Sequence, residues 1–383
     1  MGGEKIWRRN VNNLKRVGIL LAVAALTIIV SVSYKGNDVL KRAIVLGVGV
    51  DVAEEGVCVT AEVVNPGNGG EQVGTFSKTV SANGKTVAEA FQVISEKTGK
   101  ETSLGQCVLL VYGEEFAKQN FTSTAEYFAR SNSFKESSIV CCCKGKAKDL
   151  LNCGDALLQS VSISVAEKLK GQSKEVAVPA CDLLTFARSQ TELYKTGFLN
   201  YVSYQTSSNE STENPNQKQV YFDYSQIAVF RQNQMTCILS KEEALGFALL
   251  LKRTAGNVFS VTDDEGNVIT LRSNTKNVDV SAHGNSIEID VKIFVTPART
   301  DSFGAGGKYA AKSAKQVDEI SLAQVKQQAT SWAKAFLEKQ VAEDFDLLYF
   351  HEMFRRAKGD VPEVRNLQMK DIVVRLTLSV EEN

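Results

Sequence analysis

Three consecutive cysteines come nearest, by type and spacing, to residues that could do chemistry. Cys141 to Cys143 lie in the apolar stretch SIVCCCKG, and adjacent thiols could act as nucleophiles or bind a soft metal ion. The stretch predicts a strand, in which Cys141 and Cys143 face one side of a sheet and Cys142 faces the other. Cysteine also acts as a small buried hydrophobic residue. We favour that role because the sequence has no C-x-x-C pair of the zinc or thioredoxin kind.

Motifs of hydrolytic or metal-dependent catalysis are incomplete in this sequence. The two histidines, His283 and His351, lie far apart, and Arg355 stands where a zinc protease motif would need its second histidine. The G-x-S-x-G turn of serine hydrolases does not occur. A histidine near Phe350 and Phe354 on a helix face is typical of a structural role. We therefore predict that the protein is not an enzyme and has no catalytic or metal-binding residues.

Two glycine motifs resemble phosphate-binding loops without matching them. Gly84-Lys-Thr86 lacks the glycine that a phosphate loop places five residues earlier, where this chain has Thr79. Gly47-Val-Gly49 has Val52 where a dinucleotide fingerprint needs its third glycine, and it lies inside a strand pattern instead of before a helix. The sequence therefore predicts no cofactor and no cofactor-binding residues.

The elements that must position these residues alternate between strands and helices. Thr86–Lys97 has apolar residues at helical spacing and is followed by Gly99, which predicts a helix and its end. Further helical turns are expected from Glu114 onward and, more weakly, over 161–170 and 182–188. This mixture predicts an α/β (α+β mixed) fold. Strands of the first half are expected at 42–50, 57–65, 75–80, 104–112 and 138–143.

A polar stretch, 205–219 (QTSSNESTENPNQKQ), divides the chain. Pro215 is its only residue that is not polar, which is typical of a linker or a long loop. We predict a multi-domain protein, with an N-terminal domain over 37–204 and a C-terminal domain over 220–383. Two alternatives stay open: a further division of the first domain near residue 155, and an insertion at 205–219 inside a single domain.

The second half is predicted to form another mixed unit. Ser240-Lys-Glu-Glu243 is a capping box that starts a helix ending near Lys252, and 317–350 has a long amphipathic pattern. The segment 300–308 is rich in glycine and is expected to be exposed. Largely antiparallel strands are expected at 221–230, 235–239, 258–261, 268–271, 278–282 and 287–295, with a final strand at 371–380.

An uncharged apolar stretch of 18 residues, Val17–Tyr34, precedes both domains. Its length is at the lower end of the ~17–25 residues that cross a bilayer as a helix. Five basic residues in front of it and three behind it place the N-terminus inside and the rest of the chain outside. We predict a cytoplasmic basic tail over 1–16 and a retained signal anchor, a transmembrane helix, over 17–34. Cleavage after Ser33 is the alternative.

The composition is that of a charge-balanced globular protein. Its 44 basic and 44 acidic side chains cancel, which argues against nucleic acid as the main partner because phosphate binding requires a basic face. An exported chain with eight cysteines could form disulfides, but the sequence does not give their number or pairing. No motif assigns a small-molecule ligand.

Seven segments occur in a fixed order along the chain. They are RAIVLGVGVDV, VTAEVVNPG, GKTVAEAFQVIS, LGQCVLLVYGEEFA, KGKAKDLL, SKEEALGFALLL and LEKQVAEDFDLLYFHEMFRR. Together they resemble the Ger(x)C family, the C subunits of bacterial spore germination receptors. The resemblance runs from about Ala43 to about Arg356, and it depends on the order and spacing of the segments, since no single motif is specific.

The resemblance implies a protein outside the spore inner membrane that joins two polytopic membrane subunits in a nutrient-sensing germinant receptor. Family members are not enzymes, so no site residue transfers to this chain. The family's C subunits resemble lipoproteins held by a lipidated cysteine after the signal segment, whereas no cysteine here precedes Cys58. In the family, the segment that follows a Q-x-x-x-D pattern usually includes glycines. Here the corresponding residues, Asp346–Phe350, read DLLYF and include none. Both departures indicate a divergent member, in which the retained helix replaces the lipid as the membrane anchor. A helix holds more firmly, because a single acyl chain binds membranes only marginally.

Two other functions stay open at this point. One is a membrane-tethered thiol or metal-dependent enzyme that uses Cys141 to Cys143, and metal analysis of Cys142→Ser and Cys143→Ser variants would separate it from a core role. The other is a generic extracytoplasmic ligand-binding module, which requires a concave pocket.

Overall fold

A computed structural model describes most of the chain beyond residue 41. The residues it describes are 18, 20–27, 42–65, 76–119, 121–131, 133–153, 160–171, 179–192, 194–208, 218–251, 255–262, 268–297 and 317–383. The chain divides into two compact units, Met1–Arg42 and Ala43–Asn383.

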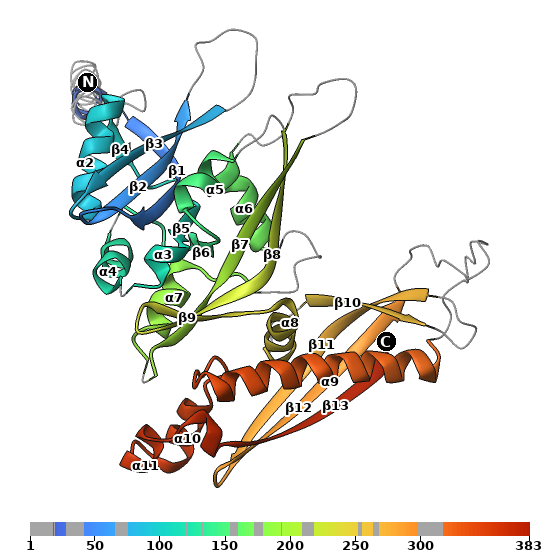
Figure 1. Ribbon diagram of the computed structural model, residues 1–383. Coiled ribbons are helices and arrows are strands. Elements are labelled where there is room, and N and C mark those ends of the chain that lie inside the picture. Colours follow the sequence, from blue (N-terminus) through green and yellow to red (C-terminus); the bar gives the residue numbers. More distant parts are fainter. Residues whose placement is uncertain are drawn as a thin grey trace, which may run out of the picture. The chain divides into compact units, whose positions relative to one another are not determined.

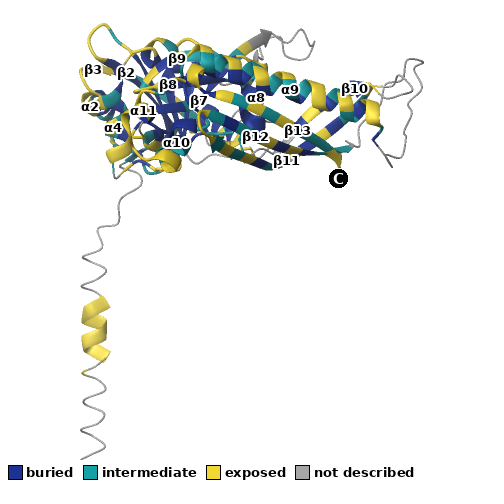
Figure 2. Cartoon of the chain, turned by 90° about the horizontal axis from the view of Figure 1, so that it is seen from below, coloured by how far each residue is buried: buried dark blue, intermediate teal, exposed yellow. Residues whose placement is uncertain are grey.

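The smaller unit contains part of the predicted anchor. Gly18 and residues 20–27 are helical. Figure 2 colours this short helix as exposed, and Leu20 is 69% exposed. The other residues of the predicted anchor over 17–34, and the predicted basic tail over 1–16, lie outside the described residues. In the part of the chain that is described, no helix is both long and apolar enough to cross a membrane.

A sheet of nine strands, counted over the described residues, organises the first part of the larger unit (Figure 1). Its order is β3-β2-β1-β5-β6-β7-β8-β9, with β4 paired to β1. Strands β1, β5, β6 and β7 are parallel, and strands β2, β3, β8 and β9 pair antiparallel with their neighbours. The strands are β1 (Arg42–Val52), β2 (Val57–Asn65), β3 (Phe76–Gly84), β4 (Glu101–Ser103), β5 (Leu109–Gly113), β6 (Ile139–Cys143), β7 (Thr196–Ser208), β8 (Lys218–Arg231) and β9 (Gln234–Leu239).

Helices cover both faces of this sheet. Alternation along β5 sends Leu110 and Tyr112 into a cluster with α2, α4 and α7, and sends Leu109 and Val111 into a second cluster with α5 and α6. The central strands β1, β5 and β6 are therefore buried on both sides, as their continuous apolar sequences require. The helices are α2 (Val87–Thr98), α3 (Glu114–Ala117), α4 (Thr122–Arg130), α5 (Ala147–Asn152), α6 (Val161–Leu169) and α7 (Leu183–Ser189).

The helix predicted over 86–97 is confirmed as α2. The Thr86 side chain accepts a hydrogen bond from the amide of Glu89 at the start of the helix, and Gly99 ends the helix in the left-handed conformation, at φ 65°. The strand predicted over 104–112 is shorter, because the chain makes a turn after Leu104 and β5 begins only at Leu109. Apolar residues at helical spacing and the terminal Gly99 therefore predicted this helix well, whereas an apolar run alone overestimated the length of the next strand.

Two glycines of β1 allow helices to approach the sheet closely. A Cβ atom on Gly47 would clash with the Ser162 hydroxyl at the start of α6. A Cβ atom on Gly49 would lie 2.9 Å from the Cβ atom of Ala147 at the start of α5. The Gly47-Val-Gly49 motif therefore serves close helix packing, which agrees with its rejection as a dinucleotide fingerprint.

Two buried carboxylates cap the same two helices. Asp51 of β1 accepts hydrogen bonds from the first two amides of α5, at 2.7 and 2.9 Å. Glu62 of β2 accepts from the first two amides of α6, at 3.1 and 2.9 Å. Burial raises the pKa of Asp51, and its two amide bonds oppose that shift. Both acids satisfy orphan donors at a helix N-terminus, which is also the positive end of the helix dipole.

The polar segment 205–219 lies at the end of a hairpin within the first sheet. Strands β7 and β8 pair antiparallel from Thr196 opposite Arg231 to Ser208 opposite Lys218, and 209–217 lies outside the described residues. The sheet therefore extends past the boundary that the sequence predicts at residue 220. Backbone pairing continues the hairpin into the polar residues 205–208, where hydropathy gave no sign of a strand. The division into two domains stays a prediction.

A second sheet, with four strands among the described residues, has the order β10-β11-β12-β13. Its first three strands are antiparallel, and β13 is parallel to β12. The strands predicted at 268–271 and 278–282 are a single strand, β11, with an irregularity between Thr275 and Asn277. The elements are α8 (Lys241–Leu250), β10 (Ala255–Thr262), β11 (Val268–His283), β12 (Ser286–Pro297), α9 (Glu319–Ala342), α10 (Phe350–Lys358), α11 (Pro362–Arg365), η2 (Met369–Asp371) and β13 (Val373–Glu382).

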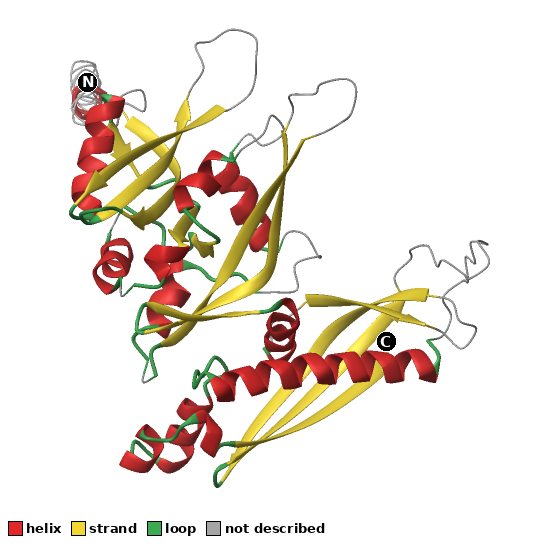
Figure 3. Ribbon diagram, in the orientation of Figure 1, coloured by secondary structure: helices red, strands yellow, loops and turns green. Residues whose placement is uncertain are grey.

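The long helix α9 lies along one face of this second sheet (Figure 3). The predicted capping box of Ser240 and Glu243 is present at the start of α8, and the amphipathic pattern over 317–350 becomes α9 and the start of α10. Strand β8 joins the two cores, because Ile227 faces the second and Ala228 faces the first. The mixed α/β fold is confirmed. The glycine-rich segment 300–308 lies outside the described residues.

Candidate functional site

The three consecutive cysteines are buried on β6. Cys141 and Cys143 pack in the cluster with α5 and α6, and Cys142 packs in the cluster on the other face, as the predicted alternation requires. Burial raises the pKa of all three thiols. Nucleophilic and metal-binding thiols need exposure and thiolate character, so the structure gives no support to an enzyme built on these residues.

The described residues contain neither a metal-binding cluster nor a disulfide. No group of three or more histidine, cysteine, aspartate or glutamate side chains that could hold a metal ion occurs among the described residues. All eight cysteines are described, and none forms a disulfide. His283 is exposed at the end of β11, far in sequence from the buried His351.

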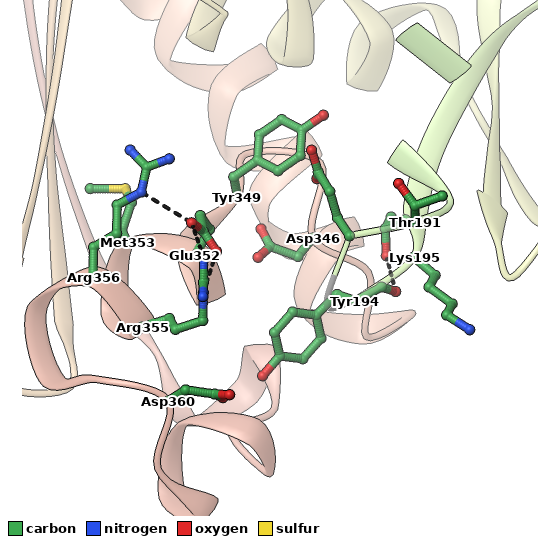
Figure 4. Close-up of a pocket in the computed structure, with 12 residues that line it drawn as sticks. Thr191, Tyr194, Lys195, Asp346, Tyr349, Glu352, Met353, Arg355, Arg356 and Asp360 are labelled. Atoms are coloured by element: carbon green, nitrogen blue, oxygen red, sulfur yellow. Dashed lines mark hydrogen bonds and ion pairs between the residues drawn. The ribbon is translucent and has the colours of Figure 1, made fainter. Parts of the chain in front are cut away.

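A cavity of about 740 Å³ lies between the segment that joins α7 to β7 and the region of α10 (Figure 4). Two of its lining residues, Lys195 and Tyr349, have positive φ angles of 47° and 58°. Such backbone costs ~1–3 kcal/mol for a residue other than glycine and is found most often at functional sites. The residues labelled in Figure 4 are Thr191, Tyr194, Lys195, Asp346, Tyr349, Glu352, Met353, Arg355, Arg356 and Asp360.

Asp346 organises the start of α10. Its carboxylate accepts hydrogen bonds from the amides of Phe350 and His351, at 3.0 and 2.8 Å, and lies 2.7 Å from Nδ1 of His351. Nε2 of His351 lies 2.6 Å from the carbonyl oxygen of Leu367. A carbonyl oxygen only accepts, so Nε2 carries a hydrogen and both ring nitrogens are engaged. The side chains of Asp346 and His351 are each 3% exposed, which makes His351 a buried structural residue.

Tyr194 connects the first sheet's side of the cavity to α10 and α11. Its ring lies over the ring of His351, with 3.5 Å between the ring centroids and 31° between the planes. Its hydroxyl donates to the carbonyl oxygen of Val364 at 2.6 Å. Removal from water raises the pKa of Tyr194 to about 12, so the hydroxyl keeps its proton and remains a donor. One side chain therefore holds two regions of the chain that are distant in sequence.

The Q-x-x-x-D pattern, Gln340 to Asp344, shapes the turn between α9 and α10. Gln340 is fully buried, and its side-chain oxygen accepts from the amide of Leu347 at 3.1 Å. Asp344 accepts from the amide of Met369 at 3.1 Å and pairs with Arg231 of β8 at 3.4 Å. This pattern therefore fixes the wall of the cavity to the first sheet.

Three charged side chains of the cavity wall, those of Glu352, Arg355 and Arg356, pair with each other. Glu352 accepts two hydrogen bonds of 2.6 Å from Arg355 and one of 3.1 Å from Arg356, and the bonds from Arg355 are the largest cause lowering the pKa of Glu352 to about 2. Figure 4 shows these contacts. Glu192 differs, because burial and then the charges of Glu352 and Asp346 raise its pKa.

Two family matches cover most of the chain. Residues 35–204 match the family described as spore germination protein N-terminal domain, and residues 225–380 match the one described as spore germination B3/GerAC like, C-terminal. The chain belongs to the GerAC family of spore germination proteins. The resemblance to germination receptor C subunits that the ordered segments indicated is confirmed.

Both matched regions of this GerAC family chain line the cavity. Tyr194 and Lys195 belong to the N-terminal match, and Asp346 and Glu352 belong to the C-terminal match. A solved structure titled "Crystal Structure of the GerBC protein" aligns with a TM-score of 0.49 and 16% identity, over 88% of this chain and 96% of that chain. No curated protein matches the sequence.

Sequence reasoning assigned no site residues and missed the contacts that shape this cavity. A signal was present in the spacing of Asp346, which stands four and five residues before the two amides that it caps. Tyr194 gave no signal, because its hydroxyl reaches a carbonyl oxygen 170 residues away in sequence.

Proposed function

We propose that this GerAC family member is a non-catalytic extracytoplasmic subunit of a spore germinant receptor. In this proposal it assembles with two polytopic membrane subunits and supports nutrient-triggered germination at the spore inner membrane. The observation that carries the proposal is the pair of family matches, in order, over 35–204 and 225–380. The apolar stretch Val17–Tyr34 is the segment that we propose as the single-pass anchor.

The chemistry of the described residues supports a role in binding or assembly. The three thiols of β6 are buried, the buried His351 is held on both ring nitrogens, and Glu352 is paired with two arginines. These groups stabilise the fold, and none of them is poised for proton transfer or nucleophilic attack.

Deletion of the gene in its spore-forming host tests the proposal. We expect spores to form normally and to germinate more slowly, or not at all, in one or more nutrients, while germination by a trigger that needs no nutrient is unchanged. A copy of the wild-type gene should restore the response. A Cys142→Ala copy should restore it equally, because alanine is a small apolar side chain that suits the core position of this buried thiol, whereas a thiol enzyme would lose activity. Unchanged germination in every nutrient that the host responds to would rule the proposal out.

A further inference from the structure

The two edge strands of the second sheet, β10 and β13, differ in whether side chains bond to their outward backbone groups. On the β10 edge, the side chain of Gln324 in α9 donates to the carbonyl oxygen of Thr262 at 2.7 Å and accepts from the Thr262 amide at 2.9 Å. Gln328 of the same helix donates to the Ser260 carbonyl oxygen at 3.5 Å. These glutamines occupy backbone groups that another strand would need, which is one way that proteins block an edge.

Strand β13 forms the opposite edge. It pairs with β12 in parallel, and the amides of Val373 and Asn383 donate to carbonyl oxygens on the β12 side. Residues that bond to the neighbouring strand alternate along a parallel ladder, so the odd-numbered residues of β13 bond to β12. The even-numbered residues, from Val374 to Glu382, therefore direct their N–H and C=O groups outward. No strand of the described chain pairs with this outer edge.

Over Arg375–Glu381, the sequence of β13 (RLTLSVE) is self-complementary about Leu378. Leu378 is buried in the second core, with Leu376 and Val380 packed against that core, whereas Arg375, Thr377 and Glu381 are on the opposite, more exposed face. An antiparallel copy of the strand would pair apolar residues on the core face, and would pair opposite charges and hydroxyl groups on the exposed face. It would place Arg375 opposite Glu381, Leu376 opposite Val380, Thr377 opposite Ser379, and Leu378 opposite its own copy.

We propose that β13 pairs antiparallel with β13 of a second copy of this chain, about a two-fold axis at Leu378. A two-fold interface is self-complementary, so each unlike pair occurs twice. The register also fits the backbone, because Leu376, Leu378 and Val380 are even-numbered residues whose N–H and C=O groups face outward and would exchange ladder bonds with the partner. This interface joins the second sheet of one chain to the second sheet of its partner, so that the two form one continuous sheet. It does not depend on the proposed function.

Charge reversal tests the pairing in the full chain, purified in a mild detergent, with the dissociation constant measured by sedimentation. Arg375→Glu and Glu381→Arg should each weaken the dimer about tenfold, because two opposite-charge pairs become two like-charge pairs. The double variant should restore wild-type affinity. An equimolar mixture of the two single variants should form heterodimers in preference to either homodimer. Arg272→Glu, on the same sheet face but on β11, is the matched control and should leave the affinity unchanged.

Disulfide trapping checks the register. A Thr377→Cys chain mixed with a Ser379→Cys chain should form an intermolecular disulfide under mild oxidation, and neither variant should do so with itself. Self-crosslinking of Thr377→Cys would show a shifted register and overturn the axis at Leu378. A wild-type chain that stays monomeric at all concentrations, or a double variant that remains as weak as the single ones, would overturn the interface itself. Circular dichroism spectra that match the wild type establish that each variant is folded.

Discussion

Replacing Asp346 with asparagine should loosen α10 while leaving the first sheet folded. The Asp346 carboxylate accepts two backbone amides and faces Nδ1 of His351, with both side chains 3% exposed. Leaving one member of a buried hydrogen bond without its partner costs about 1–3 kcal/mol, and losing a helix cap costs about 0.5–2 kcal/mol. Asparagine keeps the shape and one acceptor oxygen, but its nitrogen brings hydrogens toward a group of donors. We therefore expect a loss of about 3 kcal/mol in the free energy of unfolding.

Tryptophan fluorescence during urea denaturation measures this loss. Trp332 of α9 stacks on Phe259 of β10, with 4.9 Å between ring centroids, so it reports on the second core. A Trp7→Phe background makes Trp332 the only tryptophan in the chain. Hydrogen exchange adds a local readout, because the amides of Phe350 and His351 should exchange faster in the variant while the amides of β6 should not.

The matched control is Asp360→Asn. This carboxylate forms an ion pair with Arg365 at 2.7 Å, but both side chains are substantially exposed, at 43% and 58%. Exposed pairs contribute about 0–1 kcal/mol, so the control should differ little from the wild type. If Asp346→Asn changed the free energy of unfolding no more than this control does, the inference that the buried pair holds α10 would be refuted.

Three further predictions concern single contacts. Tyr194→Phe removes the hydrogen bond to a carbonyl oxygen of α11 and should lower the free energy of unfolding by about 1 kcal/mol in the same urea assay; an unchanged midpoint would show that the bond contributes nothing. Gly49→Ala places a methyl group 2.9 Å from the Cβ atom of Ala147 and should lower the melting temperature through overpacking of about 1–3 kcal/mol. The bonds from Arg355 lower the pKa of Glu352 to about 2, so its pairing stabilises the fold above the unfolded value of about 4.3 and ceases to do so as pH falls toward 2. The stability difference between wild type and Glu352→Gln should therefore shrink across that range in acid titrations, and a difference independent of pH would contradict it.

Short-range signals in the sequence were the most reliable guide to the fold. The helix end at Gly99 and the capping box at Ser240 each depend on residues within one helical turn, and the structure confirms both. The alternation of Cys141 to Cys143 is also local, since strand geometry alone sends neighbouring side chains to opposite faces.

Long-range contacts could not be read from the sequence. Glu62 caps a helix that begins 99 residues later, and Tyr194 reaches a carbonyl oxygen 170 residues away. The β7–β8 hairpin escaped prediction because the polar residues near its tip pair through their backbones. In each case the determining interaction depends on tertiary arrangement, which neither hydropathy nor spacing encodes.

Crosslinking in intact spore membranes, followed by identification of the proteins attached to this chain, tests the central claim most directly. The proposed function as a germinant receptor subunit predicts that two different multi-span membrane proteins are recovered. Neither should be recovered when the same procedure is applied to spores that lack the gene. Recovery of this chain with no multi-span partner, under conditions in which other membrane complexes are crosslinked, would contradict it.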